Sequence, residues 1–217
     1  MTEFFVQRIS RHHWPDDAGP EVDAAFREGL PRNAARRMSR LALMCARVLR
    51  DMPYDPETAV VYASGMSEAR NLEYYLDSFP EPSPTRFQAS VHPAGAQQAL
   101  IALERPIREF YPLVGDANLF DQALQTAALA ESNDVILVAG EEQGTWLLDL
   151  GLAEARSFAF ALHLSRGNEG ARAVVQRREN PTEAVPLKLA QVFDRLGERT
   201  DWAIPAIASG SWEWQWL

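Results

Sequence analysis

The sequence has almost no cysteine, because Cys45 is the only one among 217 residues. A disulfide framework within the chain and a metal site built from several cysteines are therefore both excluded. No apolar run approaches the ~20 residues that a bilayer-spanning helix needs. The first residues, Met-Thr-Glu-Phe-Phe-Val-Gln-Arg, lack the long apolar core of a signal peptide. These absences predict a cytoplasmic protein that meets a membrane only through a partner.

The sequence also lacks an excess of positive charge. Its 21 Lys and Arg stand against 30 Asp and Glu, which gives a formal net charge of −9. A nucleic-acid binder needs a basic surface, so this class of protein is excluded. An acidic carrier protein is not excluded, because a local arginine patch can exist on an acidic chain.

Motifs for cofactors and metals are missing as well. The sequence has no glycine-rich phosphate loop, no dinucleotide-binding fingerprint and no metal-binding signature, so we expect neither a cofactor nor a metal. His12 and His13 are adjacent and would point to opposite faces of a strand, which favours a solvated loop over a metal site.

Apolar residues are plentiful, and 47% of the chain is hydrophobic and 10% aromatic. This composition supports a sizeable core, and the length suits a single domain over residues 1–217. Apolar runs and period-two patterns predict strands at Phe4–Ile9, Thr58–Ala63, Arg108–Val114, Asp134–Ala139, Phe158–Leu164, Ala171–Arg177 and Ser211–Leu217. Helical spacing predicts helices at Pro31–Asp51, Glu68–Phe79, Ala96–Leu103, Ala117–Ala130 and Pro186–Leu196.

The alternation of these elements predicts an α/β layered domain with a mixed, mostly parallel sheet. A hairpin at Ser165–Gly170 would add an antiparallel edge, and Pro112 inside its strand indicates a sheet edge or bulge. The segments Asp16–Leu30 and Gly140–Gly144 are expected to be polar loops.

The predicted helices suggest which side chains are buried. Cys45 lies on the apolar stripe of the helix at Pro31–Asp51, for which Asn33 is the candidate cap, so a buried structural thiol is expected. Along the helix at Glu68–Phe79, Leu72, Tyr75 and Leu76 are expected to point inward.

The chain ends on an alternating pattern. Trp212, Trp214 and Trp216 would share one face of a strand, and we favour packing on the core over an exposed aromatic patch.

Four segments together carry a family resemblance, which spans roughly residues 31–145. They are the arginine-bearing helix from Arg36, Val60-Val-Tyr-Ala-Ser, Ser83-Pro-Thr-Arg-Phe followed by Ser90-Val-His92 and Gly95, and Asp134-Val-Ile-Leu-Val-Ala-Gly. Their order and spacing resemble the N-terminal half of a β-ketoacyl synthase of the thiolase fold. The chain looks most like the short stand-alone relatives of chain length factors in aryl polyene and type II polyketide-like pathways.

The departures from the family pattern bear on catalysis. The family's nucleophilic cysteine would fall at about Val114–Gly115, where neither residue is a nucleophile, and the family's two histidine motifs belong to a second half for which this chain is too short. The asparagine usual after the histidine in the short relatives is Pro93 here. Condensation needs a thiolate and oxyanion donors, so the resemblance implies no catalytic residues in this chain.

The resemblance also implies partners. A chain length factor pairs with a catalytic ketosynthase, as a heterodimer or heterotetramer, and the growing chain is carried on an acyl carrier protein in a polyene, polyketide or fatty-acid-like elongation. The turn and helix with Arg86, Phe87, Ser90 and His92 would then lie near the partner's acyl tunnel. The strand residues Phe110, Tyr111, Leu113 and Val114 would lie at the dimer interface, where a homodimer is also conceivable for the chain alone.

Other interpretations remain open from the residues themselves. Arg36, Arg37 and Arg40 form either a solvated or salt-bridged face or a docking site for an acidic carrier protein. A stand-alone enzyme that processes acyl thioesters would use His92 as base and Ser90 or Cys45 as nucleophile. Phe87 is either a core or loop anchor or a residue of the tunnel. Glu141 and Glu142 follow a buried strand, which would suit a pocket, but adjacent carboxylates on a loop are usually solvated, so a solvated position is expected. A third interpretation is an α/β domain that merely retains the fold.

Overall fold

The computed structural model describes residues 2–116, 118–179, 184–207 and 209–217. Its strands are β1 (Glu3–Trp14), β2 (Ala59–Ser64), β3 (Glu109–Val114), β4 (Asp134–Glu141), β5 (Ser157–Ser165), β6 (Ala173–Arg178), β7 (Trp202–Pro205) and β8 (Ser211–Trp216). Its helices are α1 (Pro20–Arg27), α2 (Arg32–Ala35), α3 (Arg40–Arg50), α4 (Ala69–Leu76), α5 (Pro84–Ser90), α6 (Ala94–Ala102), α7 (Leu119–Leu129), α8 (Trp146–Asp149) and α9 (Leu189–Glu198).

The described strands form one mixed sheet in the order β3-β2-β4-β5-β1-β6-β8-β7. The α/β class and the mixed sheet are confirmed. The expectation of a mostly parallel sheet is wrong, because only β3, β2 and β4 run parallel and every other pairing is antiparallel. The predicted position of the Pro112 strand is confirmed, since β3 is an edge strand of this sheet.

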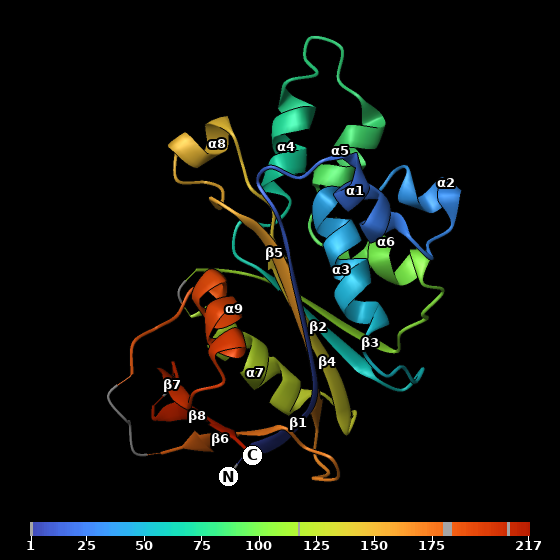
Figure 1. The fold of residues 1–217 in the computed structure, drawn as a ribbon. Coiled ribbons are helices and arrows are strands. Elements are labelled where there is room, and N and C mark those ends of the chain that lie inside the picture. The colour runs from blue at the N-terminus through green and yellow to red at the C-terminus, as the bar shows by residue number, and fades with distance from the viewer. Residues whose placement is uncertain (1, 117, 180–183, 208) are drawn as a thin grey trace.

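Helices cover both faces of the sheet (Figure 1). One face packs against α3 and α6, and the other packs against α7 and α9. Every residue of β2 is buried, which explains its continuous apolar run, since a strand covered on both faces has no solvated side. The apolar stripe predicted for α7 is confirmed, because Phe120, Ala123, Leu124 and Ala127 are all buried.

The N-terminal segment differs from its prediction. The first strand continues through His12 and His13 to Trp14, so these histidines do not lie in a loop. The segment expected to be a loop at Asp16–Leu30 contains α1. The helix expected at Pro31–Asp51 is two helices, because Ser39 adopts an extended conformation and accepts a hydrogen bond from the Ala42 amide as the N-cap of α3.

The hairpin expected at Ser165–Gly170 does not form a strand pair. β5 and β6 are separated by β1, which pairs antiparallel with both of them. The N-terminal strand therefore lies in the interior of the sheet, between two strands that follow about 150 residues later in the chain. Local pattern carries no information about such a distant insertion.

The tryptophan-rich tail packs on the core, as predicted. Trp212 and Trp214 are 2% exposed, and the Trp214 ring stacks on Trp202 at a centroid distance of 5.2 Å. The Trp212 indole donates to the Asp121 carboxylate of α7 at 2.7 Å, which ties β8 to the helix above it.

Helix α4 does not lie on the sheet. It packs against α5 and α8 beyond the end of the parallel strands, at the top of Figure 1. The expectation that Leu72 and Leu76 point inward is wrong, because both are exposed while Asn71 and Glu73 are buried. Among the described residues, no helix has the length and apolar character required to cross a membrane.

Candidate functional site

The three parallel strands end side by side, at Ser64 of β2, Val114 of β3 and Glu141 of β4. In open α/β sheets, ligand sites usually form at this carboxyl edge. Here the Glu141 carboxylate fills the edge, because it accepts hydrogen bonds from the Gly65 amide, the Met66 amide at 3.1 Å and the Ser64 hydroxyl at 3.3 Å. Val114 is 52% exposed and offers no reactive group. The edge is thus closed by a carboxylate clamp.

Glu141 and the adjacent Glu142 are both buried, so the expectation of a solvated polar loop at Gly140–Gly144 is wrong for these two residues. Glu141 and Glu142 are 3% and 7% exposed, and Glu141 belongs to β4. Burial raises the pKa of each of these two carboxyls to about 7. Glu142 accepts from the Leu41 amide at 3.2 Å, and Glu68 accepts from the Gly95 amide at 2.9 Å and also has its pKa raised by burial to about 7.

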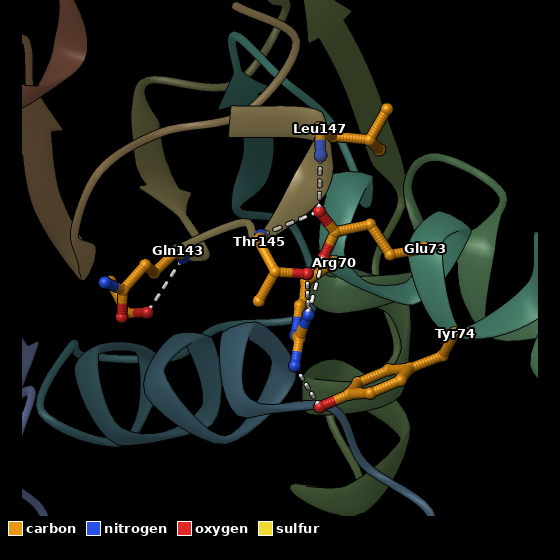
Figure 2. Close-up of polar contacts among 7 residues, drawn as sticks. Arg70, Glu73, Tyr74, Gln143, Thr145 and Leu147 are labelled. Atoms are coloured by element: carbon orange, nitrogen blue, oxygen red, sulfur yellow. Dashed lines mark hydrogen bonds and ion pairs between the residues drawn. The ribbon is translucent and has the colours of Figure 1, made fainter. Parts of the chain in front are cut away.

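Glu73 makes the most complete of these clamps (Figure 2). Its carboxylate accepts from the Thr145 amide at 2.7 Å, the Leu147 amide at 2.9 Å and the Arg70 guanidinium at 2.6 Å. Arg70 also donates to the Tyr74 hydroxyl at 2.9 Å. Burial by itself raises the pKa of Glu73, but the hydrogen bonds from Arg70 and the two amides outweigh it and lower this pKa below its usual value. The clamp joins α4 to the start of α8.

The residues of the enzymatic alternative are not brought together. The Ser90 hydroxyl donates to the Phe87 carbonyl at 2.8 Å. The His92 ring stacks on Tyr62 at 5.0 Å, and neither ring nitrogen has a hydrogen-bond partner. Burial lowers the pKa of His92 to about 4 and raises the pKa of the fully buried Cys45 thiol. This arrangement supplies no activated nucleophile, because a thiol with a raised pKa stays protonated at neutral pH.

The arginines predicted as a docking face do come together with one from the predicted tunnel turn. Arg36, Arg37, Arg40 and Arg86 all line one cavity of about 510 Å³. Trp14 also lines it and lies 4.9 Å below the Arg40 guanidinium.

Strand β3 has an unpaired outer edge among the described strands. Phe110 packs on the α3 side of the sheet, while Tyr111 and Leu113 pack on the α7 side. The Tyr111 hydroxyl donates to the Glu109 carboxylate at 2.8 Å. All four predicted interface residues of this strand retain some exposure, so the edge is open to pairing with another strand.

The α4–α5 hairpin carries a second set of exposed apolar side chains, which we call the hairpin patch: Leu72, Leu76, Phe79, Phe87 and Val91, each between 37% and 54% exposed. Leu72 and Leu76 are one turn apart on α4 and share a face. Phe79 and Phe87 both contact the Tyr75 ring, at centroid distances of 5.4 and 5.3 Å. The Tyr75 ring of α4 therefore joins the segment after α4 to α5. Phe87 is thus both a contact of the hairpin and an exposed aromatic.

A family model for the β-ketoacyl synthase N-terminal domain matches residues 8–216. The chain belongs to this family. The predicted resemblance, drawn from residues 31–145, is therefore confirmed and extends over nearly the whole chain. Comparison with curated proteins gave no match.

Solved structures with the same fold include two ketosynthase and chain length factor complexes. One chain of "Ketosynthase (ApeO) in Complex with its Chain Length Factor (ApeC) from Xenorhabdus doucetiae" is 20% identical with a TM-score of 0.67, over 99% of this chain and 100% of that one. A chain of "The ishigamide ketosynthase/chain length factor" is 15% identical with a TM-score of 0.57, over 71% of this chain and 53% of that one.

A β-ketoacyl synthase from Burkholderia phymatum is 14% identical with a TM-score of 0.54, over 84% of this chain and 67% of that one. These matches confirm the thiolase-like fold.

The burial of the Glu68, Glu73, Glu141 and Glu142 carboxylates was not predicted from the sequence. A signal existed only for Glu141, which directly follows an uninterrupted apolar strand and so begins inside the core. Glu73 is flanked by Leu72 and Tyr74, and nothing in the pattern marks it as the buried member of that run.

Proposed function

We propose that the chain is a non-catalytic subunit that pairs with a catalytic β-ketoacyl synthase and helps to shape the tunnel for the growing acyl chain. The observation that carries this proposal is the strand end where the family places its nucleophilic cysteine. The resemblance puts that position at about Val114–Gly115, where neither residue is a nucleophile, and the Glu141 carboxylate lies beside this strand end. A condensing enzyme needs a thiolate at this point.

Two open surfaces support the pairing. Among the described strands, the outer edge of β3 is open to continue the sheet into a second molecule. The hairpin patch offers exposed leucines and phenylalanines as a further contact surface. Exposed apolar surface of this kind is typical of protein interfaces, since burying it releases ordered water. The ApeO complex named above contains a ketosynthase with its chain length factor, and its fold match supports the same type of partner here.

The hairpin patch also supports a role in product length. Phe87 is 52% exposed and projects from α5, where the Ser83 hydroxyl caps the helix. A bulky aromatic at the end of an apolar tunnel limits how many carbons fit, because each excess methylene would overlap it. Arg86, Ser90 and His92 flank this residue in the same turn and helix. We assign the products to the polyene, polyketide or fatty-acid-like class, delivered on an acyl carrier protein for which Arg36, Arg37 and Arg40 are docking candidates.

The decisive experiment is co-expression with a catalytic ketosynthase, followed by size-exclusion chromatography with mass determination. We expect a one-to-one complex or a dimer of such complexes. Leu76→Asp should weaken it at least ~10-fold, because a charge would be buried in the interface. Leu217→Asp is the matched control, since Leu217 is 75% exposed and follows β8, at the end of the sheet opposite to β3.

Failure to form a complex with several catalytic ketosynthases would overturn the proposal, as would equal losses in the two variants. If the complex forms, Phe87→Ala should shift its products to longer chains, which mass spectrometry of the released acyl groups would show. The same variant leaves product length unchanged if Phe87 is only a loop anchor. Hydrolysis of acyl thioesters by the chain alone, abolished by His92→Ala, would favour the enzymatic alternative.

A further inference from the structure

The arginine-lined cavity has a definite position in the fold. It lies between the end of α1, the connection from α2 to α3, and the α4–α5 hairpin. Its volume of about 510 Å³ is within the range of small-molecule sites. Arg36 and Arg37 come from the connection, Arg40 from the first turn of α3 and Arg86 from α5, so residues of separate segments line one space. The Arg86 guanidinium donates to the Tyr74 carbonyl at 2.9 Å.

The positive charge of this cavity is largely uncompensated. Of its arginines, Arg27 is committed to Asp23, which it contacts in a bidentate pair. Within the described part of the chain, no carboxylate forms an ion pair with Arg36, Arg37, Arg40 or Arg86. Arginines without a carboxylate partner that line one concave site create a strong positive local potential. Its sign is opposite to that of the chain's net charge of −9.

The rest of the lining is mixed, with Ser39, Asn71 and Thr85 beside apolar and aromatic side chains. Trp14 is 6% exposed, its ring stacks on Phe26 at 4.7 Å, and Met38 and Leu43 complete the buried lining. A ligand with an anionic end and an aromatic body matches this lining, because the Tyr74 ring lines the cavity and is 43% exposed. Guanidinium forks match phosphate oxygens in bidentate geometry, which favours a phosphate over a compact halide-like anion.

Glu142 forms the buried floor beside the arginines. It is 7% exposed, and one of its oxygens accepts from the Leu41 amide in the first turn of α3. The charged groups that act on it are Arg40 of α3, Arg70 and Glu73 of α4, and Glu68 just before α4. Its negative charge, when present, opposes an anion in the cavity.

We propose that this cavity binds a phosphate ester, with the phosphate held by Arg36, Arg37, Arg40 and Arg86 and the organic group packed against the Tyr74 ring and Ala89. The ester is either a free small molecule or the phosphate of a group tethered to a partner protein. Only the tethered source rests on the proposed function, because it requires a carrier protein as partner. The site itself requires no synthase.

Phenyl phosphate is the probe for the free source, titrated into the whole chain by isothermal calorimetry at low salt. We expect saturable binding that Arg36→Ala and Arg37→Ala each weaken about 10-fold, the value of one charge-assisted hydrogen bond. Arg32→Ala removes the same charge from α2 outside the cavity and is the matched control, with little change expected. Equal losses of affinity in Arg32→Ala and Arg37→Ala would show that phenyl phosphate responds only to the general surface charge, and this result would overturn the proposal.

Glu142→Gln gives a readout that a structural role would not produce. The amide keeps an acceptor for the Leu41 amide but removes the charge. The variant should bind phenyl phosphate at least about threefold more tightly than the wild type at pH 8, where the wild-type carboxyl is ionised, and about equally at pH 6. Comparing the two proteins at each pH cancels the ionisation of the probe.

The tethered source is tested with an acyl carrier protein with and without its phosphopantetheine arm. Binding of the loaded form alone, sensitive to Arg37→Ala, supports the proposal with a tethered ligand. Absence of saturable binding in both the phenyl phosphate and the carrier-protein titrations overturns it. Neither result depends on complex formation with a ketosynthase, so the two proposals fail separately.

Discussion

Helices α3 and α4 are both amphipathic, but they bury opposite kinds of side chain. Helix α3 buries leucine, valine and methionine against the sheet and directs Arg40 and Arg47 outward. Helix α4 buries Asn71 and Glu73 and leaves Leu72 and Leu76 exposed. The first is the usual arrangement for a helix on a core. The second is its inverse.

The difference lies in what stabilises each helix. Helix α3 is stabilised by removal of apolar surface from water, at roughly 1.5–3 kcal/mol for each fully buried leucine. Helix α4 stands beyond the sheet and is held by the Glu73 clamp to α8 and by its contact with α5. Its leucines are therefore not used within the chain, which is why we assign them to a partner.

The sharpest way to break this comparison is to remove the polar anchor of α4. Glu73→Ala leaves the Arg70 guanidinium and the Thr145 and Leu147 amides without their acceptor, and we expect a loss of about 3–5 kcal/mol in the free energy of unfolding. Urea denaturation followed by circular dichroism measures it. Glu81→Ala, an exposed site after the same helix, should change the value by less than about 0.5 kcal/mol.

A slightly smaller loss is expected from the apolar anchor of α3. Leu49→Ala removes a fully buried side chain and should cost about 2–5 kcal/mol in the isolated chain. Leu76→Ala makes the same chemical change at a residue that is 41% exposed and should cost well under about 1 kcal/mol. Similar losses at the two positions would contradict the inverted burial of α4.

A third effect, spread over several pH units, is a dependence of stability on pH. Folding raises the pKa of Glu68, Glu141 and Glu142 from 4.5 to about 7, so the folded state holds protons that the unfolded state has released between these values. Stability is therefore greatest at acidic pH and falls as pH rises through 7, by at most about 1.4 kcal/mol per pH unit for each group.

Denaturation midpoints at pH 5, 6, 7 and 8 measure this slope, and Glu141→Gln should flatten it. Glu73 acts with the opposite sign, since its lowered pKa means that its contribution is lost only on acidification. A stability that rises from pH 5 to 8 would show that these three carboxyls are ionised in the folded protein.

Much of the fold followed from local pattern. The runs of β2 and β4, the stripe of α7 and the tryptophans of β8 each contain their own burial signal, because the period of the side chains matches one element. The break before α3 was missed, although Ser39 is a strong N-cap residue placed directly before the apolar stripe.

The rest depended on neighbours distant in sequence. No local pattern shows that β1 enters between β5 and β6, or that α4 stands clear of the sheet. The arginines of the candidate cavity were visible as a group in part, through Arg36, Arg37 and Arg40. The addition of Arg86 required the packing of α5 beside them. Adjacent glutamates are usually solvated, and only the position of Glu142 against the Leu41 amide shows why it is not.

The interior position of β1 has a consequence for how the chain is made. During synthesis this strand emerges first, but both of its partners in the sheet leave the ribosome roughly 150 residues later. At about 5–20 residues per second, its backbone hydrogen-bonding groups wait on the order of ten seconds for β5 and β6. Completion of the sheet is therefore a late event with high contact order, and the nascent chain exposes an unpaired strand until it occurs.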